Sequence, residues 1–526
     1  MGARFADKVK AHGIRVMRKA HHRTLHHSST TTYRRRQPPT SPMPRLMPAA
    51  RRYRRMGWLP TSLIAPEKLP AEARLPLRYY LPYYGTSKLG WMLYGRSPID
   101  PELPWQSSSS WNDYFPEAQP GWEAPTKDST FVSLRLQGPN PFMLRRVDPD
   151  TALGEAGDAS IFSLDFSRRY AGIFPATEAR FELGSGGLEP SSIRVGDKVA
   201  RPGDGDQWDD FKRVVNSLDA RESVFIRHLL NVHLMVGQAY ALAAYSLPVW
   251  HPLRAFMDFF TYGTLVVNDA AYKALLTPDS YFLRSHFVSA ADARRLVENS
   301  MADFDFDEWN WPKDRAKRGI GEIPDHPFVR EADELWTIFR DFVDSHLDDL
   351  YDSDDEIRSD HHLRRWYETV CEVLPGDETE RTITDRDELA QVMTSLLWNN
   401  VVHEVCGNLS PLLDYSDPRD PRDLMGVNFD HLRAMVDDDR DDLEPRAADV
   451  LLMDQATYVS RFNVAGNNLM TVNANRYVDD PRLRDAIIGL QARLGEAEAE
   501  LTARNAQRDI PFLNLEPSRF EASISF

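Results

Sequence analysis

Three histidines in two apolar segments are the residues best suited to chemistry in this sequence. His228 and His233 stand five residues apart in a stretch, 228–253, that contains no Asp, Glu, Lys or Arg. His403 stands five residues before Asn408 in a second apolar segment, and the chain ends at Phe526 directly after a patterned segment. Buried imidazoles that converge with a terminal carboxylate could hold one metal ion, which would indicate redox chemistry.

The spacing of these residues requires an unusual helix. On a regular α-helix, five steps of about 100° place two side chains roughly 140° apart, so His228 and His233 would not share a face. A π-turn, with hydrogen bonds from residue i to i+5, restores the alignment, and such turns favour functional sites. We therefore predict a π-bulged helix that carries both histidines. A purely structural role for the pair is the alternative that the spacing leaves open.

Other familiar metal patterns are absent from the sequence. It contains neither a CxxC nor an HExxH motif, which argues against structural zinc and against a zinc protease. The two cysteines, Cys371 and Cys406, are too few for a disulfide framework and are compatible with a reducing compartment. We interpret Cys406 as a small core residue rather than a reactive thiol.

The elements that would position the histidines are mainly helical. Apolar residues recur at helical spacing in five segments, namely 289–301, 329–351, 387–405, 446–459 and 481–505. The stretch 228–253 is long enough to cross a membrane, but its His, Asn and Gln side chains would need polar partners in lipid. We predict instead a long central helix buried in a large helical domain.

Short apolar runs at 131–134 and 161–164 could be strands or short helices. The aromatic and proline-rich residues 58–122 are interpreted as irregular structure wrapped on a core. The predicted fold class is therefore mainly α, with minor β structure.

Charge is distributed unevenly along the chain. The net charge is −16, yet residues 1–57 hold fifteen Lys and Arg and a single acid, Asp7, which leaves about −30 for the remainder. An acidic body argues against nucleic acid as a partner. We interpret 1–57 as a basic, flexible amino-terminal segment and 58–526 as one large domain. We expect a cytoplasmic protein, because no run suits a secretory signal, and peripheral membrane contact through the basic segment is the alternative.

The order and spacing of residues around the histidines also carry a family resemblance. The matching residues are Trp208, Lys212, Asp219, the run 228–233, His251-Pro252-Leu253, Asn268-Asp269-Ala270-Ala271, 387–391, Trp398, His403, 503–505, 510–512, 515–518 and 522–525. In this arrangement the chain resembles the lipoxygenases, the non-haem iron dioxygenases of polyunsaturated fatty acids. The likeness covers most of 125–526, so 58–526 is expected to be a lipoxygenase-like catalytic domain. The family's usual amino-terminal β-barrel has no obvious counterpart, which implies a short form.

The resemblance implies a ligand for each position of a metal site. His228, His233 and His403 would be neutral imidazole ligands of one non-haem iron per chain. Asn408 would supply a weaker oxygen ligand, and the carboxylate of Phe526 would complete the site. Manganese is an alternative that the ligand types leave open.

The resemblance also implies a reaction and a substrate. A metal-bound hydroxide would abstract a hydrogen atom from a polyunsaturated fatty acid, and O2 would then add to give a hydroperoxide. Ala271 and Leu275 would line the substrate and oxygen pocket. We expect a monomer.

Several residues depart from the family pattern. The family's second motif spaces its His and Asn by four residues, whereas His403 and Asn408 are five apart. A local bulge could absorb the extra residue, or Asn408 points away and water takes its place. Phe526 stands where isoleucine is usual, and Val224 and Pro411 stand where glutamines are frequent, so the surroundings of the metal differ. Two alternatives are therefore kept, a lipid hydroperoxide isomerase or lyase and an inactive lipid-binding homologue.

Overall fold

The computed structural model of the chain describes residues 53–55, 64–66, 123–147, 160–276, 289–375, 382–408, 429–437 and 468–524. The predicted helix at 446–459, nearly all of residues 1–57 and most of 58–122 lie outside these ranges. Two short strands, β1 (Tyr53–Arg55) and β2 (Ile64–Pro66), pair in antiparallel fashion.

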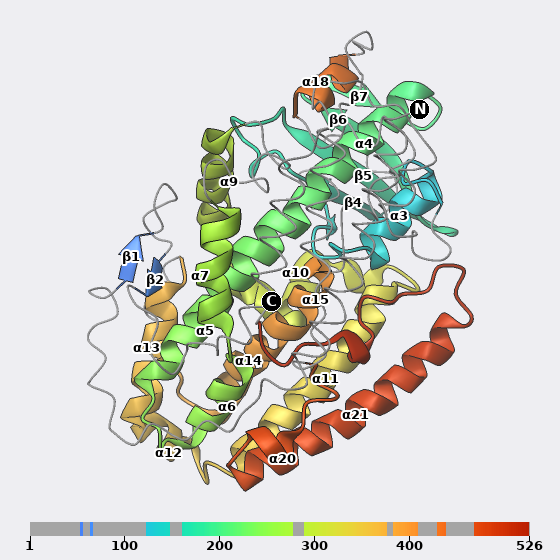
Figure 1. Cartoon of the computed structure of the whole chain (residues 1–526). Coiled ribbons are helices and arrows are strands. Elements are labelled where there is room, and N and C mark those ends of the chain that lie inside the picture. The colour runs from blue at the N-terminus through green and yellow to red at the C-terminus, as the bar shows by residue number, and fades with distance from the viewer. Residues whose placement is uncertain are drawn as a thin grey trace, which may run out of the picture.

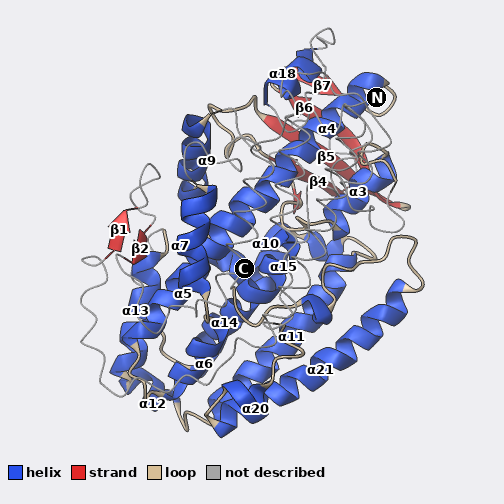
Figure 2. Ribbon diagram, viewed as in Figure 1, coloured by secondary structure: helices blue, strands red, loops and turns tan. Residues whose placement is uncertain are grey.

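Helices make up most of the described chain and surround a single hydrophobic core (Figures 1 and 2). The mainly α prediction is confirmed. Besides the elements treated below, the α-helices are α6 (Pro252–Phe260), α7 (Thr264–Leu275), α9 (Ala290–Ala302), α10 (Trp311–Arg318), α12 (Asp354–Ser359), α13 (His361–Val373), α18 (Phe429–Asp437) and α20 (Ala474–Tyr477).

A long central helix passes through this core. It is built from α4 (Asp206–Arg221), the π-helix η4 (Glu222–Gly237) and α5 (Gln238–Ala243), which follow one another without a break. All residues of η4 are buried except His228, which is partly buried, and its two charged side chains, Glu222 and Arg227, form ion pairs with Arg169 and Glu308. The predicted buried helix is therefore confirmed, and no helix of the described residues is both long and apolar enough to span a membrane.

A second interrupted helix packs across the central one. It consists of α14 (Arg386–Trp398), the π-turn η9 (Asn399–His403) and α15 (Glu404–Asn408). The π geometry predicted for His228 and His233 is present in η4. The second segment also contains a π-turn, but it ends at His403, and Glu404–Asn408 is α-helical. Such turns misalign backbone carbonyls, and a side-chain amide compensates here, since Asn399 Nδ2 donates to the Val232 carbonyl of η4 at 3.4 Å.

Three further predicted helices also form. The segment 289–301 is α9, 329–351 corresponds to α11 (Pro327–Asp348), and 481–505 is α21 (Pro481–Asn505). In Figure 1, α21 runs along α11 on the outside of the molecule, and α11 in turn packs on α14.

A five-stranded antiparallel sheet covers one end of the central helix (Figure 2). Its strands lie in sequence order, namely β3 (Arg145–Arg146), β4 (Ser160–Asp165), β5 (Thr177–Gly184), β6 (Gly187–Val195) and β7 (Lys198–Ala200). The run 161–164 is thus a strand, whereas 131–134 lies in helix α3 (Asp128–Gln137). The ring of Phe131 stacks on Phe181 of β5, which joins α3 to the sheet.

The last described residues return to the centre of the molecule. Residues 520–524 are all buried, and the Ser523 hydroxyl donates to the Tyr262 carbonyl at 2.7 Å. A Cβ atom on Gly237 would lie only 2.5 Å from Ile524 Cδ1, so this glycine permits the chain to pass close to η4. Phe526 itself lies outside the described residues.

Candidate metal centre

Two imidazoles and one carboxylate meet where the two π-containing helices cross. The Nε2 atoms of His228 and His233 are 3.1 Å apart, and Glu404 Oε2 lies 3.4 Å from the first and 3.5 Å from the second. Among the described residues, these three form the one group of at least three His, Cys, Asp or Glu donors that could share a metal ion. His233 and Glu404 are buried, and His228 is nearly so.

The tautomer of His233 is set by Asn268 of α7. The Asn268 amide nitrogen donates to the His233 carbonyl at 2.6 Å and to Gln238 Oε1 at 2.8 Å, which leaves its oxygen as an acceptor. That oxygen lies 3.0 Å from His233 Nδ1, so Nδ1 carries the proton and Nε2 presents a lone pair to the cluster. An imidazole oriented in this way is suited to bind a metal.

The charges of the cluster favour a cation between the three donors. Burial lowers the pKa of His233 to about 4, against the opposing effect of Glu404, so this imidazole is neutral at pH 7. The side chain of Glu404 is fully buried. A buried carboxylate is penalised by several kcal/mol, on the order of the ion desolvation cost, unless a positive charge compensates it.

The distances within the cluster agree with metal coordination. Ligand atoms about 2.1 Å from a metal lie about 3.0 Å apart at octahedral angles and about 3.4 Å apart at tetrahedral angles. The three observed separations, 3.1, 3.4 and 3.5 Å, fall at or close to these values. The residues present therefore fit a mononuclear metal ion bound by two nitrogens and one oxygen.

The structure does not bring His403 into this group. Its ring stacks on Phe142, with centroids 4.3 Å apart, and on Trp309, with centroids 4.9 Å apart. Neither ring nitrogen has a hydrogen-bond partner in the described part of the chain. Burial and the nearby Arg227 hold the pKa of His403 well below its usual value, so the ring is neutral. Among the described residues, the group that could share a metal ion therefore contains two imidazoles and the carboxylate of Glu404, the residue after His403.

The other expected site residues occupy varied positions. Asn408 ends α15, one helical turn after Glu404, but its side chain lies outside the described residues, as does Phe526. Ala271 and Leu275 are partly buried on α7, three and seven residues after Asn268, and so lie on the helix face that holds His233. Their assignment to a substrate pocket stays a prediction.

Two residues of the site went unrecognised in the sequence. Glu404 stands four residues before Asn408. This is the spacing expected from the family resemblance for the His and Asn of the second motif, where His403 was assigned. A carboxylate inside an apolar segment was the available signal. Gly407 is the second residue, because a Cβ there would lie 2.4 Å from His228 Cβ, so only glycine lets α15 approach η4 this closely.

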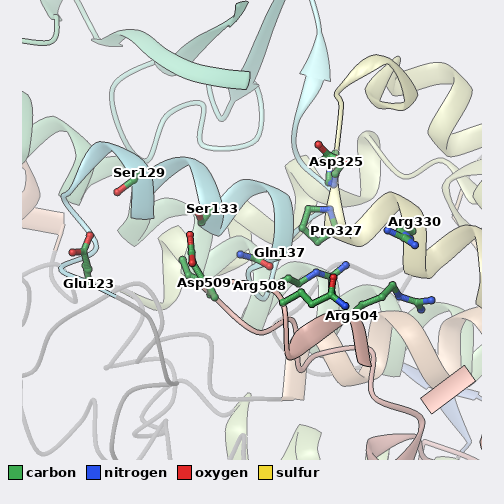
Figure 3. Close-up of a pocket in the computed structure, with 13 residues that line it drawn as sticks. Glu123, Ser129, Ser133, Gln137, Asp325, Pro327, Arg330, Arg504, Arg508 and Asp509 are labelled. Carbon is green, nitrogen blue, oxygen red and sulfur yellow. The ribbon is translucent and has the colours of Figure 1, made fainter. Parts of the chain in front are cut away.

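A separate cavity of about 920 Å³ lies between α3, the start of α11 and the end of α21 (Figure 3). Most of its lining residues are polar or charged, among them Ser129, Gln137, Arg330 and Arg508, and none belongs to the cluster. A polar cavity does not suit a fatty-acyl chain, and we do not assign it to the metal centre.

Sequence comparison connects this site with known proteins. The family model "Lipoxygenase" matches residues 197–410, a range that includes the central helix and Glu404. Over this segment the chain is similar to the lipoxygenases. It is 25% identical over 311 residues to the mouse (Mus musculus) polyunsaturated fatty acid lipoxygenase ALOX12, covering 57% of this chain and 46% of that protein. It is 27% identical over 468 residues to the linoleate 9/13-lipoxygenase of Pseudomonas aeruginosa, covering 75% of this chain and 66% of that protein.

Solved lipoxygenase structures share the fold. The coral 8R-lipoxygenase superposes with a TM-score of 0.70 at 16% sequence identity, covering 88% of this chain and 76% of that one. The Delta413-417:GS LOX variant gives 0.71 at 16% identity, covering 90% and 80%. The predicted lipoxygenase-like helical domain is therefore confirmed. The chain spans about half to two thirds of the curated relatives' length.

Proposed function

We propose that this protein is a metal-dependent dioxygenase of the lipoxygenase type, which inserts O2 into a polyunsaturated fatty acid and yields a hydroperoxide. The observation that carries the proposal is the convergence of His228, His233 and Glu404 inside the segment that matches the lipoxygenase model. Non-haem iron, or manganese, is the metal that such nitrogen and oxygen donors suit. When bound, it would supply one-electron oxidation of a C–H bond between two double bonds.

The protein's own residues would position the reaction. His228 and His233 present ring nitrogens, and Asn268 keeps the second ring in one tautomer. The apolar surroundings exclude water from the reacting carbon, which protects a reactive radical. Ala271 and Leu275 would border the acyl chain on the same face of α7. We retain Asn408 and the Phe526 carboxylate as proposed further oxygen ligands, so residues added after Phe526 should weaken metal binding.

Oxygen consumption tests the proposed reaction. Metal-loaded protein should consume O2 with linoleate or arachidonate and form conjugated-diene hydroperoxide in equal amount, because one O2 enters each product. His233→Ala should abolish both signals. Conversion of added lipid hydroperoxide without O2 uptake would instead assign an isomerase or lyase, and no turnover of either substrate by metal-loaded protein would leave only lipid binding.

A further inference from the structure

The side chains of the adjacent residues His403 and Glu404 lie in different surroundings at the junction of η9 and α15. His403 lies against Phe142 and Trp309, while Glu404 reaches the two imidazoles of η4. Successive helical residues differ by about 100° in direction, so only one of the two can point at a common centre. The register of this junction therefore decides which donor completes the metal site.

The surroundings of His403 are those of a packing ring. The His403 ring stacks nearly parallel on Phe142 and on Trp309, with interplanar angles of 23° and 27°. It therefore packs in the core as a neutral aromatic ring. Trp309 is itself fixed, because its Nε1 donates to Asn399 Oδ1 at 2.8 Å. To reach the cluster, His403 would have to leave this stack and the helix would have to rotate.

The surroundings of Glu404 are those of a ligand. Its Oε2 atom lies within 3.5 Å of both Nε2 atoms, and Gly407, one turn later on the same helix face, brings the backbone against His228. Glutamate is also the anionic member of the two-histidine, one-carboxylate arrangement that holds non-haem iron in many oxygenases.

We propose that Glu404, and not His403, is the third protein ligand of the metal, so that this protein holds its metal with two imidazoles and a glutamate. The inference rests on the proposed metal centre and goes beyond it. Compared with three imidazoles, the set carries one more negative charge and one more hard oxygen donor. Both features favour Fe(II) and Mn(II) relative to softer ions that prefer imidazole.

Metal titration of two neighbouring variants separates the possibilities. Full-length protein, stripped of metal, is titrated anaerobically with Fe(II) and with Mn(II). His403→Phe keeps an aromatic ring stacked between Phe142 and Trp309. It should bind either metal with a Kd within about threefold of that of the original chain, because packing is preserved. Glu404→Gln keeps the size of the side chain but removes its charge, and should weaken binding about 100-fold. Unfolding of the metal-free variants, followed by circular dichroism, serves as the control for folding.

If His403→Phe weakened metal binding more than Glu404→Gln, or if both variants weakened it equally, His403 would be a ligand and the inference would be overturned. Should Glu404→Gln fail to fold, Glu404→His provides a second test. It should still bind metal but shift preference from Mn(II) toward Zn(II), and an unchanged preference would count against Glu404 as a ligand. Absence of metal binding by the original chain would instead remove the proposed function, so the two failures are distinguishable.

Discussion

At the scale of single residues, the site depends on side chains that fix the ligands rather than bind the metal. Asn268 contacts both the ring and the carbonyl of His233. Replacing Asn268 with Ala should free the ring to change tautomer and weaken Fe(II) binding by about 10- to 100-fold. Asn400 is a matched control, because it is also buried and donates to a carbonyl (Phe260, 2.6 Å), whereas its side chain has no hydrogen bond to His228, His233 or Glu404 in the described part of the chain. Anaerobic titration should show near-normal Kd for Asn400→Ala, and equal weakening in both variants would contradict the positioning role.

A second residue-scale prediction concerns pH. Burial lowers the pKa of His346 to about 4 from its ordinary 6.5, with Asp480 and Asp349 opposing the shift. As the pH falls, His346 therefore becomes protonated near pH 6.5 in the unfolded chain but only near pH 4 in the folded chain. Stability present above pH 6.5 is lost as the pH falls through this window, by about 2 kcal/mol at pH 5.

His346→Phe isolates this effect. The ring stacks on Phe256 with centroids 5.8 Å apart, so phenylalanine keeps the packing and removes the titration. Urea unfolding at pH 7 and pH 5 should show that the original chain loses about 2 kcal/mol more than the variant over this interval. Identical losses of unfolding free energy in the two proteins would show that His346 does not contribute to the pH dependence of stability.

The residues that sequence reasoning found and missed differ in physical character. The pair His228 and His233 was recognisable, because a five-residue spacing in an apolar run has few explanations. Glu404 was overlooked although it stands four residues before Asn408, because choosing between it and His403 also requires the rotation of α15 about its axis. That rotation is set by tertiary contacts of Phe142, Trp309 and Gly407, which are remote in sequence from one another or invisible in a hydropathy pattern.

At the scale of elements, the close approach of α15 to η4 is what assembles the centre. Gly407→Ala would place a methyl group 2.4 Å from His228 Cβ and push the helices apart. We expect weaker metal binding together with a stability loss of about 1–3 kcal/mol, as for overpacked cores. Gly489→Ala in α21 is the control, since nothing lies within 4 Å of its Cβ and alanine favours a helix by about 1 kcal/mol. Thermal unfolding and metal titration of both variants check this, and full metal binding by Gly407→Ala would contradict it.

Helix positions were predictable where periodicity was long and uninterrupted. The segment 481–505 coincides with α21, and 289–301 agrees with α9 to within a residue. The short run 131–134 gave no decision between strand and helix, because four apolar residues satisfy either period. Its packing on the sheet through Phe131 settled the matter.

At the scale of the whole molecule, buried ion pairs tie the β-rich end to the central helix. Arg135 of α3 pairs with Asp219 of α4, both fully buried, and Asn140 Nδ2 also donates to Asp219 at 2.7 Å. Asp219→Ala would leave the arginine buried without this charge and should reduce the free energy of unfolding by about 3–5 kcal/mol. The exposed pair Arg294–Glu298 is the control, and Glu298→Ala should cost less than about 0.5 kcal/mol. Urea unfolding measures both, and similar losses would contradict the prediction.

The fold as a whole could be anticipated further than the site. Helical class, the buried central helix and its π geometry followed from spacing and from apolar character, whereas the π-turn η9 was not predicted. The order of the five-stranded sheet did not follow, because 161–164 was the only part of the sheet recognised as a possible strand, and β5 and β6, of eight and nine residues, were not identified. The basic segment, with its expected flexibility and membrane contact, lies almost entirely outside the described residues, so those expectations stay predictions.

X-ray absorption of the iron-loaded protein tests the central claim most directly, because it counts the imidazoles around the metal. We predict nitrogen and oxygen neighbours at about 2.1 Å, with outer-shell scattering that corresponds to two imidazole rings per iron. Loss of one ring's contribution on His233→Ala would agree with this assignment. Scattering from three imidazoles in the original chain, or from none, would contradict a centre built from His228, His233 and Glu404.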